Sequence, residues 1–425
     1  IITMDTGITA NAEAEFCRQR GVQFICTDHH KIQPEKMPDC LILNPKSHPD
    51  PSYQELCGCG ITFVLLRKLA GELNPPAVVW TDLLALAGMA TICDVVPLNG
   101  VNHSLARQGI AALMRSTRPV LVKLREACAV QTGLDEKDVG FRLGPRINAV
   151  GRLEHADLVV QAFVGNDPDP LIRHMELCNE RRKQIQQGIV SEARTLAQAQ
   201  GDAPILFLGG KDWHPGVVGI AASKIAEEFW RPTWMFQVKD GQCKGSARSL
   251  EGFDVTEAMS AAGEHFGKFG GHKAAGGFSF SADNREVIRE ALCDYAEGKL
   301  RQEPDIWESK ITYDCAIPEH LLQLELADLL DELKPFGHGF EEPLFAVDTK
   351  VQGVKYYNDK ATGEPKHTAI LIPSSGGPPK RVLFFNRVIP EKDLAPDTRF
   401  LVSAARNVFR GNESLSLYGQ DWQPI

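Results

Sequence analysis

Acidic and imidazole side chains follow apolar runs at three separate places in the first hundred residues, and this pattern constrains the fold most. Asp5 follows the run over residues 1–4, and Asp28-His29-His30 follows the run over residues 22–27. Asp94 ends a long apolar stretch that begins at Leu83. In an open α/β sheet the binding crevice lies at the carboxyl ends of the strands. The pattern therefore predicts a parallel-sheet lobe whose functional groups gather at one edge.

Periodicity then divides the chain. Residues 168–200 are rich in Glu, Arg, Lys, Gln and Ala and predict a long solvated helix that acts as a spacer. A second α/β pattern follows, and after residue 307 come short alternating runs separated by Gly, Pro and Asn, typical of a small β-barrel of the oligonucleotide-binding type. The predicted fold class is thus α/β, with a metal-binding lobe over 1–165, a connecting helix over 166–200, a second α/β lobe over 201–303 and a barrel over 304–425.

Composition indicates a globular protein and excludes a membrane protein. Of the 425 residues, 43% are apolar and 24% are charged, and no apolar run approaches the roughly 18 residues that a membrane span needs. The eleven cysteines are scattered, without Cys-x-x-Cys or a Cys/His quartet at zinc spacing, so we expect reduced thiols and a cytoplasmic location. The net charge of −9 disfavours non-specific duplex binding but allows a locally basic groove. The chain opens with Ile inside a strand-like run, so we expect a fragment that lacks an amino-terminal segment.

Asp5, Asp28, His29, His30 and Asp94 suit a hard or borderline divalent ion such as Mg²⁺ or Mn²⁺. Two such ions can clamp a phosphoryl group and turn water into a nucleophile, which predicts a metal-dependent phosphodiesterase. The alternative is that Asp28 caps a helix while both histidines lie in an exposed loop. These side chains cannot fill two octahedral shells, so further ligands are expected from elsewhere, with the missing segment as the natural source.

Basic residues predict phosphate contacts in two regions. Arg142, Arg146 and Arg152, with Asn148 among them, form either a phosphate track that also stabilises charge on the scissile phosphate, or a helix surface with ordinary ion pairs. Ser246 and Arg248 occupy alternate positions of residues 245–249, and they face the same way if this segment is extended. A tight turn is the alternative.

Two further patterns carry weaker signals. Gly270, Gly271 and His272, flanked by lysines, predict a phosphate-binding loop or, alternatively, a glycine turn with a surface histidine. Aromatic and basic side chains in the barrel could stack bases, although aromatics in a small barrel are as often core: Arg381, Phe384, Phe385, Arg387, Tyr418 and Trp422. We expect Trp213 to be core.

Several motifs resemble one known family. Met4-Asp5-Thr6-Gly7-Ile8, Thr27-Asp28-His29-His30 and Asp94-Val95-Val96-Pro97-Leu98 look like the second, third and fourth motifs of the DHH phosphoesterases, in the same order. The segments over residues 140–153, 213–220, 245–249 and 269–272 resemble its RecJ subfamily of single-strand-specific 5′→3′ DNA exonucleases. The resemblance covers essentially the whole chain, but the family's first motif, which supplies ligands to the other metal, is absent.

The resemblance implies roles for these residues. Asp5 would bridge two Mn²⁺ or Mg²⁺ ions, His29 and Asp94 would complete one ion's protein shell, and Asp28 and His30 would orient ligands or assist proton transfer. Arg152 is expected to be catalytic together with Asp28 and His30. Ser246 and Arg248 would anchor the 5′ phosphate of single-stranded DNA.

The implied activity is the release of 5′-mononucleotides from single-stranded DNA in recombination and repair, with repair proteins as further partners. The given polypeptide alone is expected to have little activity. One alternative is a DHH phosphodiesterase for short oligonucleotides, cyclic dinucleotides or polyphosphate, which would need neither the barrel nor the spacer. The other is a non-catalytic single-strand-binding relative, against which the intact Asp5, His29 and Asp94 argue.

Overall fold

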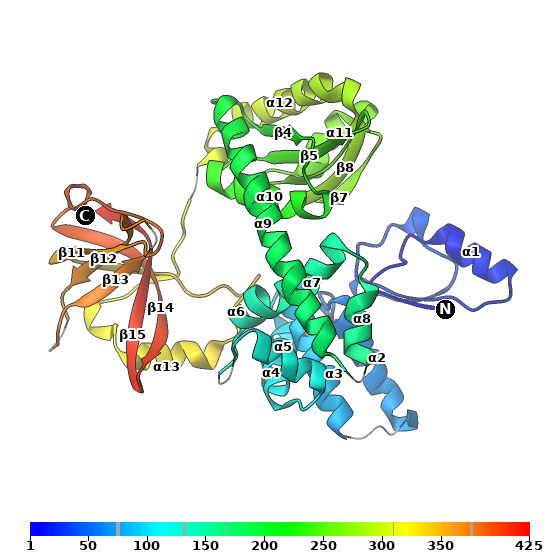
Figure 1. The fold of residues 1–425 in the computed structure, drawn as a ribbon, viewed down its shortest axis with the longest axis horizontal. Helices are drawn as coiled ribbons and strands as arrows, with labels where there is room; N and C mark the ends of the chain where they lie inside the picture. Colours follow the sequence, from blue (N-terminus) through cyan, green and yellow to red (C-terminus); the bar gives the residue numbers. More distant parts are fainter. Residues whose placement is uncertain (74–76, 131–132, 166, 309, 361, 375–376) are drawn as a thin grey trace. The chain divides into compact units, whose positions relative to one another are not determined.

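A computed structural model describes residues 1–73, 77–130, 133–165, 167–308, 310–360, 362–374 and 377–425, shown in Figure 1. The chain divides into two compact units, and each is described by itself. The first comprises residues 1–118, 131–140 and 311–425, and the second comprises residues 119–130 and 141–310. The finer four-domain division stays a prediction. Residue 166, at which its second segment was expected to begin, lies outside the described residues.

The first unit begins with a parallel sheet of three short strands, as the apolar runs predicted. Strand β2 (Ile25–Thr27) lies in the middle, between β1 (Ile2–Met4) and β3 (Leu41–Leu43). Because all three strands run in the same direction, their carboxyl ends lie at one edge of the sheet. The helices of this part are α1 (Asn11–Gln19), α2 (Gly58–Leu73), α3 (Ala77–Cys93), α4 (Gly100–Arg115) and the short α6 (Glu136–Asp138).

The carboxyl-terminal part of the first unit is a seven-stranded sheet. Helix α13 (Leu324–Leu333) lies between strands of this sheet in the sequence. A barrel was predicted, but among the described residues no ladder joins the outer strands, so the pairing is that of an open sheet. Alternate apolar residues form its core, including Val347, Ile370, Phe384 and Phe400, each at most 1% exposed. The strands, in sheet order, are β11 (Gly353–Asn358), β12 (Pro365–Ile372), β13 (Lys380–Phe384), β15 (Asn412–Pro424), β14 (Asp397–Phe409), β10 (Phe345–Lys350) and β9 (Cys315–Ala316).

The second unit contains a five-stranded sheet covered on both faces. Along β4 (Leu206–Gly210), Phe207 packs into one core and Leu206 and Leu208 into the other, because successive strand residues point to opposite faces. The sheet order is β4, β5 (Thr233–Lys239), β6 (Gln242–Arg248), β8 (Ala275–Ser281) and β7 (Lys268–His272). Its helices include α10 (Pro215–Phe229), α11 (Val255–Ala261) and α12 (Arg285–Gln302).

The predicted long helix is α9 (Asp169–Ala199), but it is more than a solvated spacer. Its carboxyl-terminal half buries Ile189, Val190, Ala193 and Ala197 in the core beneath α10. The same core contains Trp213, 1% exposed, as predicted. The helices that pack against α9 are α5 (Pro119–Ala127), α7 (Gly144–Leu153) and α8 (Asp157–Val164), and a π-helix over Val139–Leu143 directly precedes α7 in the sequence.

No helix within the described residues has the length and apolar character needed to cross a membrane. None of the eleven cysteines, all of which the structure describes, forms a disulfide bond.

Candidate functional site

The strand register places Asp5 and Asp28 side by side. Met4 pairs with Thr27, so the residue after each strand reaches the same sheet edge. The backbone N–H of Asp5 donates to the Thr27 carbonyl at 3.0 Å, and that of Asp28 donates to the Leu43 carbonyl at 3.1 Å. Asp5 adopts a left-handed conformation with φ of 63°, which turns the chain sharply directly after the strand.

Asp28 is a buried anchor for both histidines. Its side chain is 1% exposed. One carboxylate oxygen accepts the Ile8 N–H at 2.9 Å, and the other accepts the N–H groups of His29 and His30 at 2.8 and 3.2 Å. The second oxygen also lies 2.7 Å from His30 Nδ1. These contacts agree with an orienting role for Asp28 and do not match a helix cap, because no helix begins there.

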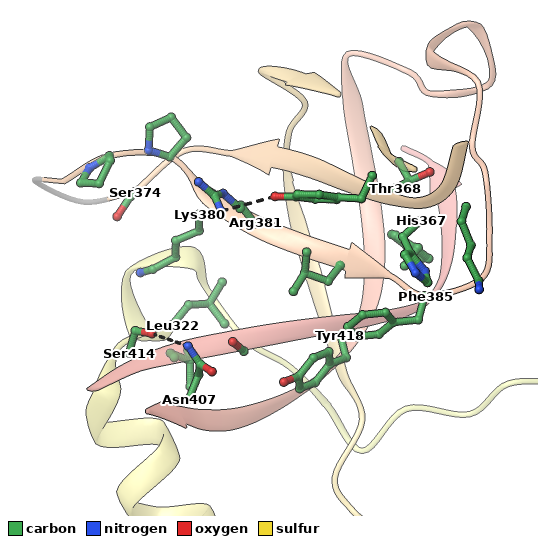
Figure 2. Close-up of a pocket in the computed structure, with 18 of the residues that line it drawn as sticks. Leu322, His367, Thr368, Ser374, Lys380, Arg381, Phe385, Asn407, Ser414 and Tyr418 are labelled. Atoms are coloured by element: carbon green, nitrogen blue, oxygen red, sulfur yellow. Dashed lines mark hydrogen bonds between the residues drawn. The ribbon is translucent and has the colours of Figure 1, made fainter. Parts of the chain in front are cut away.

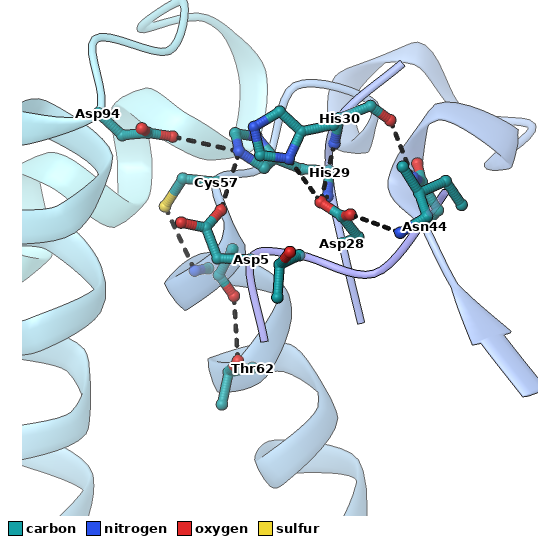
Figure 3. Close-up of polar contacts among 12 residues, drawn as sticks. Asp5, Asp28, His29, His30, Asn44, Cys57, Thr62 and Asp94 are labelled. Atoms are coloured by element: carbon teal, nitrogen blue, oxygen red, sulfur yellow. Dashed lines mark hydrogen bonds and ion pairs between the residues drawn. The ribbon is translucent and has the colours of Figure 1, made fainter. Parts of the chain in front are cut away.

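His29 lies between two carboxylates, as Figure 3 shows. Its Nε2 atom is 3.0 Å from Asp5 Oδ1 and 3.6 Å from Asp94 Oδ2. The ligand atoms of Asp5, His29 and His30 all lie within 4.8 Å of one another. We call Asp5, His29 and Asp94 the acidic cluster.

The third member of the acidic cluster comes from a helix end. Helix α3 ends at Cys93, and Asp94 follows it directly, with Val95 in the left-handed region at φ of 57°. Gly58, the first residue of α2, makes room for the cluster: a Cβ there would lie 2.6 Å from Asp5 Cβ. The positive amino-terminal end of α2 therefore lies against a carboxylate, which is favourable.

The acidic cluster perturbs its own titration. The hydrogen bond to Asp5 raises the pKa of His29, and the nearby charges of Asp94 and Asp5 add to this. Burial raises the pKa of Asp94. Burial also raises the pKa of Asp28, but hydrogen bonds from His30 and Ile8 outweigh it and leave that pKa below its usual range.

The acidic cluster fits a divalent cation by its chemistry. Two carboxylates and one imidazole, partly open to solvent, are donors that Mn²⁺ and Mg²⁺ accept. The imidazole of His29, whose pKa the hydrogen bond to Asp5 raises, lies between these two carboxylates.

A second site lies in the other unit, where Ser246 and Arg248 occupy alternate positions of β6. The segment is an extended inner strand and not a tight turn. Arg248 donates to the Ser246 hydroxyl and, at 3.0 Å, to the Ser223 hydroxyl. Ser246, Arg248 and Arg152, which lies near the end of α7, line a cavity of about 360 Å³ that we call the arginine cavity. Its lining residues are Gly151, Arg152, Pro215, Gly216, Val218, Gly219, Lys244, Gly245, Ser246 and Arg248.

The start of α10 forms one wall of the arginine cavity. A Cβ on Gly216 would lie 2.0 Å from the Arg152 carbonyl oxygen, so only glycine allows the end of α7 to approach here. His214 caps the helix and accepts the Gly216 N–H at 3.1 Å, while its carbonyl accepts those of Val217 and Val218. The helix therefore contributes the positive end of its dipole to the cavity rather than free donors.

The arginine cavity holds positive charge without a balancing carboxylate. No ion pair among the described residues involves Arg152 or Arg248. Burial lowers the pKa of both guanidiniums, and for Arg248 the neighbouring charge of Arg152 lowers it further. Arginines remain charged under such shifts, so the cavity favours an anion.

The predicted arginine track is not brought together as a set. Arg146 donates to the carbonyls of Arg142 and Ala127, at 2.8 and 3.3 Å, and lies 3.7 Å from Glu176. These contacts match the structural alternative for Arg146. Arg142 and Asn148 are exposed and do not line the arginine cavity. A substrate role for the three stays a prediction.

Gly270, Gly271 and His272 do not form the predicted loop. They belong to the edge strand β7, paired with β8, and all three are exposed. Gly271 lies very close to the neighbouring strand: a Cβ on this residue would be 2.5 Å from the Gly276 Cα. The close pairing of the two strands therefore depends on glycine here. They are not among the residues that line the arginine cavity.

The seven-stranded sheet carries a cavity of about 1300 Å³, shown in Figure 2. Phe385 is 59% exposed and stands 5.8 Å from the Tyr418 ring and 5.3 Å from the His367 ring. Lys380 Nζ is buried here without a hydrogen-bond partner. Basic and aromatic groups therefore share this wall, as base stacking requires.

The predicted stacking residues thus separate into two kinds. Phe384 belongs to the core of the sheet, at 1% exposed, and only borders the cavity, whereas Phe385 and Tyr418 stand with Arg381 on its wall. Arg387 lies 4.3 Å from the Trp422 ring centre and also pairs with Asp421, outside the lining.

Sequence reasoning missed Gly58 and Lys244. Lys244 precedes Ser246 and Arg248 by two and four residues, so the period of a strand would have placed it on the same face. Gly58 had no signal of this kind, because its proximity to Asp5 arises only from tertiary packing.

Comparisons with known proteins agree with this fold and site. The DHH family, N-terminal domain, matches residues 1–89, the DHHA1 domain matches residues 201–298, and the RecJ OB domain matches residues 313–421. These three matches place the fold within the DHH class.

Relatives narrow the class further. "Single-stranded-DNA-specific exonuclease RecJ" of Haemophilus influenzae is 31% identical over the whole chain, which covers 77% of that protein. The Bacillus subtilis protein of the same name is 35% identical over 83% of the chain and 45% of its own length. A crystal structure of RecJ with Mn²⁺ from Thermus thermophilus matches the whole chain with a TM-score of 0.86 and 30% identity, over 61% of that structure. The chain belongs to the RecJ family, and it spans about half the length of the Bacillus subtilis relative.

Proposed function

We propose that this chain supplies part of a metal-dependent exonuclease that degrades single-stranded DNA from a phosphorylated 5′ end. The observation that carries the proposal is the acidic cluster, in which His29 Nε2 lies 3.0 Å from Asp5 and 3.6 Å from Asp94. The names of the relatives, and the Mn²⁺ in the Thermus thermophilus structure, support the same activity and cofactor.

The acidic cluster would hold Mn²⁺ or Mg²⁺ through Asp5, His29 and Asp94, with Asp5 as the bridging ligand. When bound, such ions lower the pKa of a water molecule and neutralise charge on the phosphodiester. Asp28 keeps both histidines oriented, and His30, held through Nδ1, keeps its other ring nitrogen for a proton or a substrate contact.

The arginine cavity would receive the 5′ phosphate. Arg152, Lys244 and Arg248 supply positive charge, and the Ser246 hydroxyl supplies a neutral contact. Guanidinium groups bind phosphate oxygens in pairs, which gives orientation as well as affinity. A single strand presents such an end without a complementary strand around it.

The cavity of the seven-stranded sheet would bind nucleotides further along the strand. Phe385 and Tyr418 would offer ring faces to bases, and Arg381 on the same wall would supply positive charge for the backbone. Phe385→Ala should weaken binding of long strands by about 1–3 kcal/mol per stacked base and leave very short strands unaffected. Phe409→Ala, an exposed aromatic outside the cavity lining, is the matched control.

The test compares substrates labelled at the 3′ end: single strands and duplexes, each with a 5′ phosphate or a 5′ hydroxyl. With the chain completed by the family's first motif, we expect Mn²⁺-dependent release of mononucleotides from the phosphorylated single strand, and little release by residues 1–425 alone. Equal digestion of duplex DNA, or digestion confined to dinucleotides and other very short substrates, would instead favour a different DHH phosphodiesterase.

A further inference from the structure

A second group of metal-ligand side chains lies outside both sites described above. His174 Nε2 is 2.7 Å from Glu154 Oε2 and 3.5 Å from Cys178 Sγ. The three ligand atoms lie within 4.8 Å of one another. Cys178 is 4% exposed, while the side chains of Glu154 and His174 are 33% and 38% exposed. The group is therefore anchored in the interior and open to solvent on one side.

The sequence brings these residues together through two helices. His174 and Cys178 are four residues apart on α9, so they share one face of the helix. Glu154 follows α7 directly as its C-cap residue, and α7 packs against α9. Two ligands thus come from one rigid helix and the third from the end of a neighbouring one.

We propose that Glu154, His174 and Cys178 bind one divalent cation of the zinc class. Thiolate, imidazole and carboxylate are the three donor types that proteins use for Zn²⁺. The acidic cluster has no thiolate among its three members and suits harder ions, so the two sites should select different metals. This inference does not depend on the proposed nuclease activity.

The distances support a tetrahedral ion. With zinc–nitrogen and zinc–sulfur bonds of about 2.0–2.1 and 2.3 Å, the two ligand atoms are about 3.5 Å apart. His174 and Cys178 already have this separation. The contact between Glu154 and His174 is shorter than the roughly 3.3 Å that a tetrahedral site needs, because a proton and not a metal now joins them.

Metal binding would therefore exchange protons for the cation. The Cys178 thiol proton would leave to solvent, the imidazole of His174 would carry its hydrogen on Nδ1 so that Nε2 is free for the cation, and the partly exposed carboxylate would move outward by about half an ångström. Water would fill the fourth position from the open side. The bound ion would fix the end of α7, two residues beyond Arg152, to α9.

The experiment uses the full chain after chelator treatment and titrates it with Co²⁺, a zinc substitute whose bond to a thiolate gives a charge-transfer absorption band. We expect such a band at one equivalent, and we expect Zn²⁺ to abolish it by displacement. Cys178→Ser should remove the band, whereas Cys293→Ser, which alters another free cysteine, should keep it. Asp94→Asn should also keep it, because the acidic cluster binds elsewhere.

His174→Gln provides the second readout. Loss of an outer-shell partner already weakens metal binding about 10–100-fold, so loss of a direct ligand should cost at least that much. Zn²⁺ should raise the melting temperature of the wild type but not of His174→Gln, and His155→Gln, an exposed neighbour, should behave as the wild type. A wild-type chain without the thiolate band, or a band that persists in Cys178→Ser, would overturn the proposal. If Cys178→Ser does not fold, the partly exposed His174 decides the question through the same titration.

Discussion

The acidic cluster and the arginine cavity solve opposite electrostatic problems with different kinds of backbone. Asp5 and the residue after Asp94 adopt left-handed conformations, and the buried Asp28 holds the histidines from behind. In the arginine cavity, the charged groups of Lys244 and Arg248 come from a regular strand. At the acidic cluster, turns in the backbone bring together carboxylates that repel one another unless a cation lies between them. At the arginine cavity, a regular strand is enough to place Lys244 and Arg248 on the same side.

The two sites also differ in how the metal-free chain balances charge. In the acidic cluster the imidazole of His29, whose pKa the hydrogen bond to Asp5 raises, lies between two carboxylates. In the arginine cavity no described carboxylate pairs with Arg152 or Arg248, and burial lowers the pKa of both. The acidic cluster should therefore respond strongly to pH and metal, and the arginine cavity to phosphate.

The largest effect is expected from Asp5→Asn, which removes the carboxylate nearest His29. Metal chemistry supplies several kcal/mol of transition-state stabilisation, so hydrolysis should fall at least about 100-fold. Isothermal titration with Mn²⁺ and single-turnover cleavage measure the two losses. Asp39→Asn, an exposed carboxylate of the same lobe, is the control. Strand binding should persist, and near-normal turnover in Asp5→Asn would exclude Asp5 as a metal ligand.

The arginine cavity is tested by Arg248→Ala on paired substrates. A charge-assisted contact contributes about 1.5–3 kcal/mol, so binding of a 5′-phosphorylated strand should weaken roughly 10–100-fold. Binding of the 5′-hydroxyl strand should change little. Arg194→Ala, which breaks a surface ion pair with Glu228, is the matched arginine control. Equal losses on both strands would mean that Arg248 acts only through its contacts with Ser223 and Ser246.

Local sequence signals predicted the parts of both sites that depend on one element. Parallel strands ending at Asp5 and Asp28 follow from two apolar runs, and the shared face of Ser246 and Arg248 follows from strand periodicity. Each of these inferences needs only the period of a strand or helix.

Sequence reasoning failed where the outcome depended on packing between elements. Arg142, Arg146 and Arg152 were expected to lie together as one track, but Arg146 donates to the carbonyls of Arg142 and Ala127, and only Arg152 lines the arginine cavity. Gly270-Gly271-His272 looked like a loop, yet pairing with β8 makes it a strand. The sheet order, on which barrel closure depends, is likewise not encoded in any single run.

A subtler test exchanges one methyl group at each site. In Gly58→Ala the new Cβ would lie 2.6 Å from Asp5 Cβ, so Asp5 must shift, and we expect Mn²⁺ affinity to fall about tenfold, the loss typical of a disturbed ligand-orienting contact. In Gly216→Ala the Cβ meets the Arg152 backbone, and this overpacking should cost about 1–3 kcal/mol of stability as well as phosphate affinity. Thermal unfolding and the two binding titrations separate the effects. If each variant impaired both sites equally, the two sites would not be independent.

The smallest effect is the pH dependence that distinguishes the two sites. His29 binds a metal only when neutral, and the hydrogen bond to Asp5 raises its pKa above 6.5 in the metal-free chain. A raised pKa means that protonated His29 stabilises the metal-free fold below pH 6.5, and that this stabilisation is lost as pH rises through the raised value. A metal ion must displace that proton, so Mn²⁺ affinity should fall as the pH drops below the raised pKa of His29, by at most about tenfold per unit for one proton. Arg152 and Arg248 stay charged throughout, so binding of a 5′-phosphorylated strand without metal should change little above about pH 6, the second pKa of a phosphate monoester.

The variant His29→Gln tests the assignment of the titrating group. It lacks the His29 proton, so the stability of the protein without metal should lose the part of its pH dependence that this proton contributes. An unchanged pH dependence would place the titrating group elsewhere.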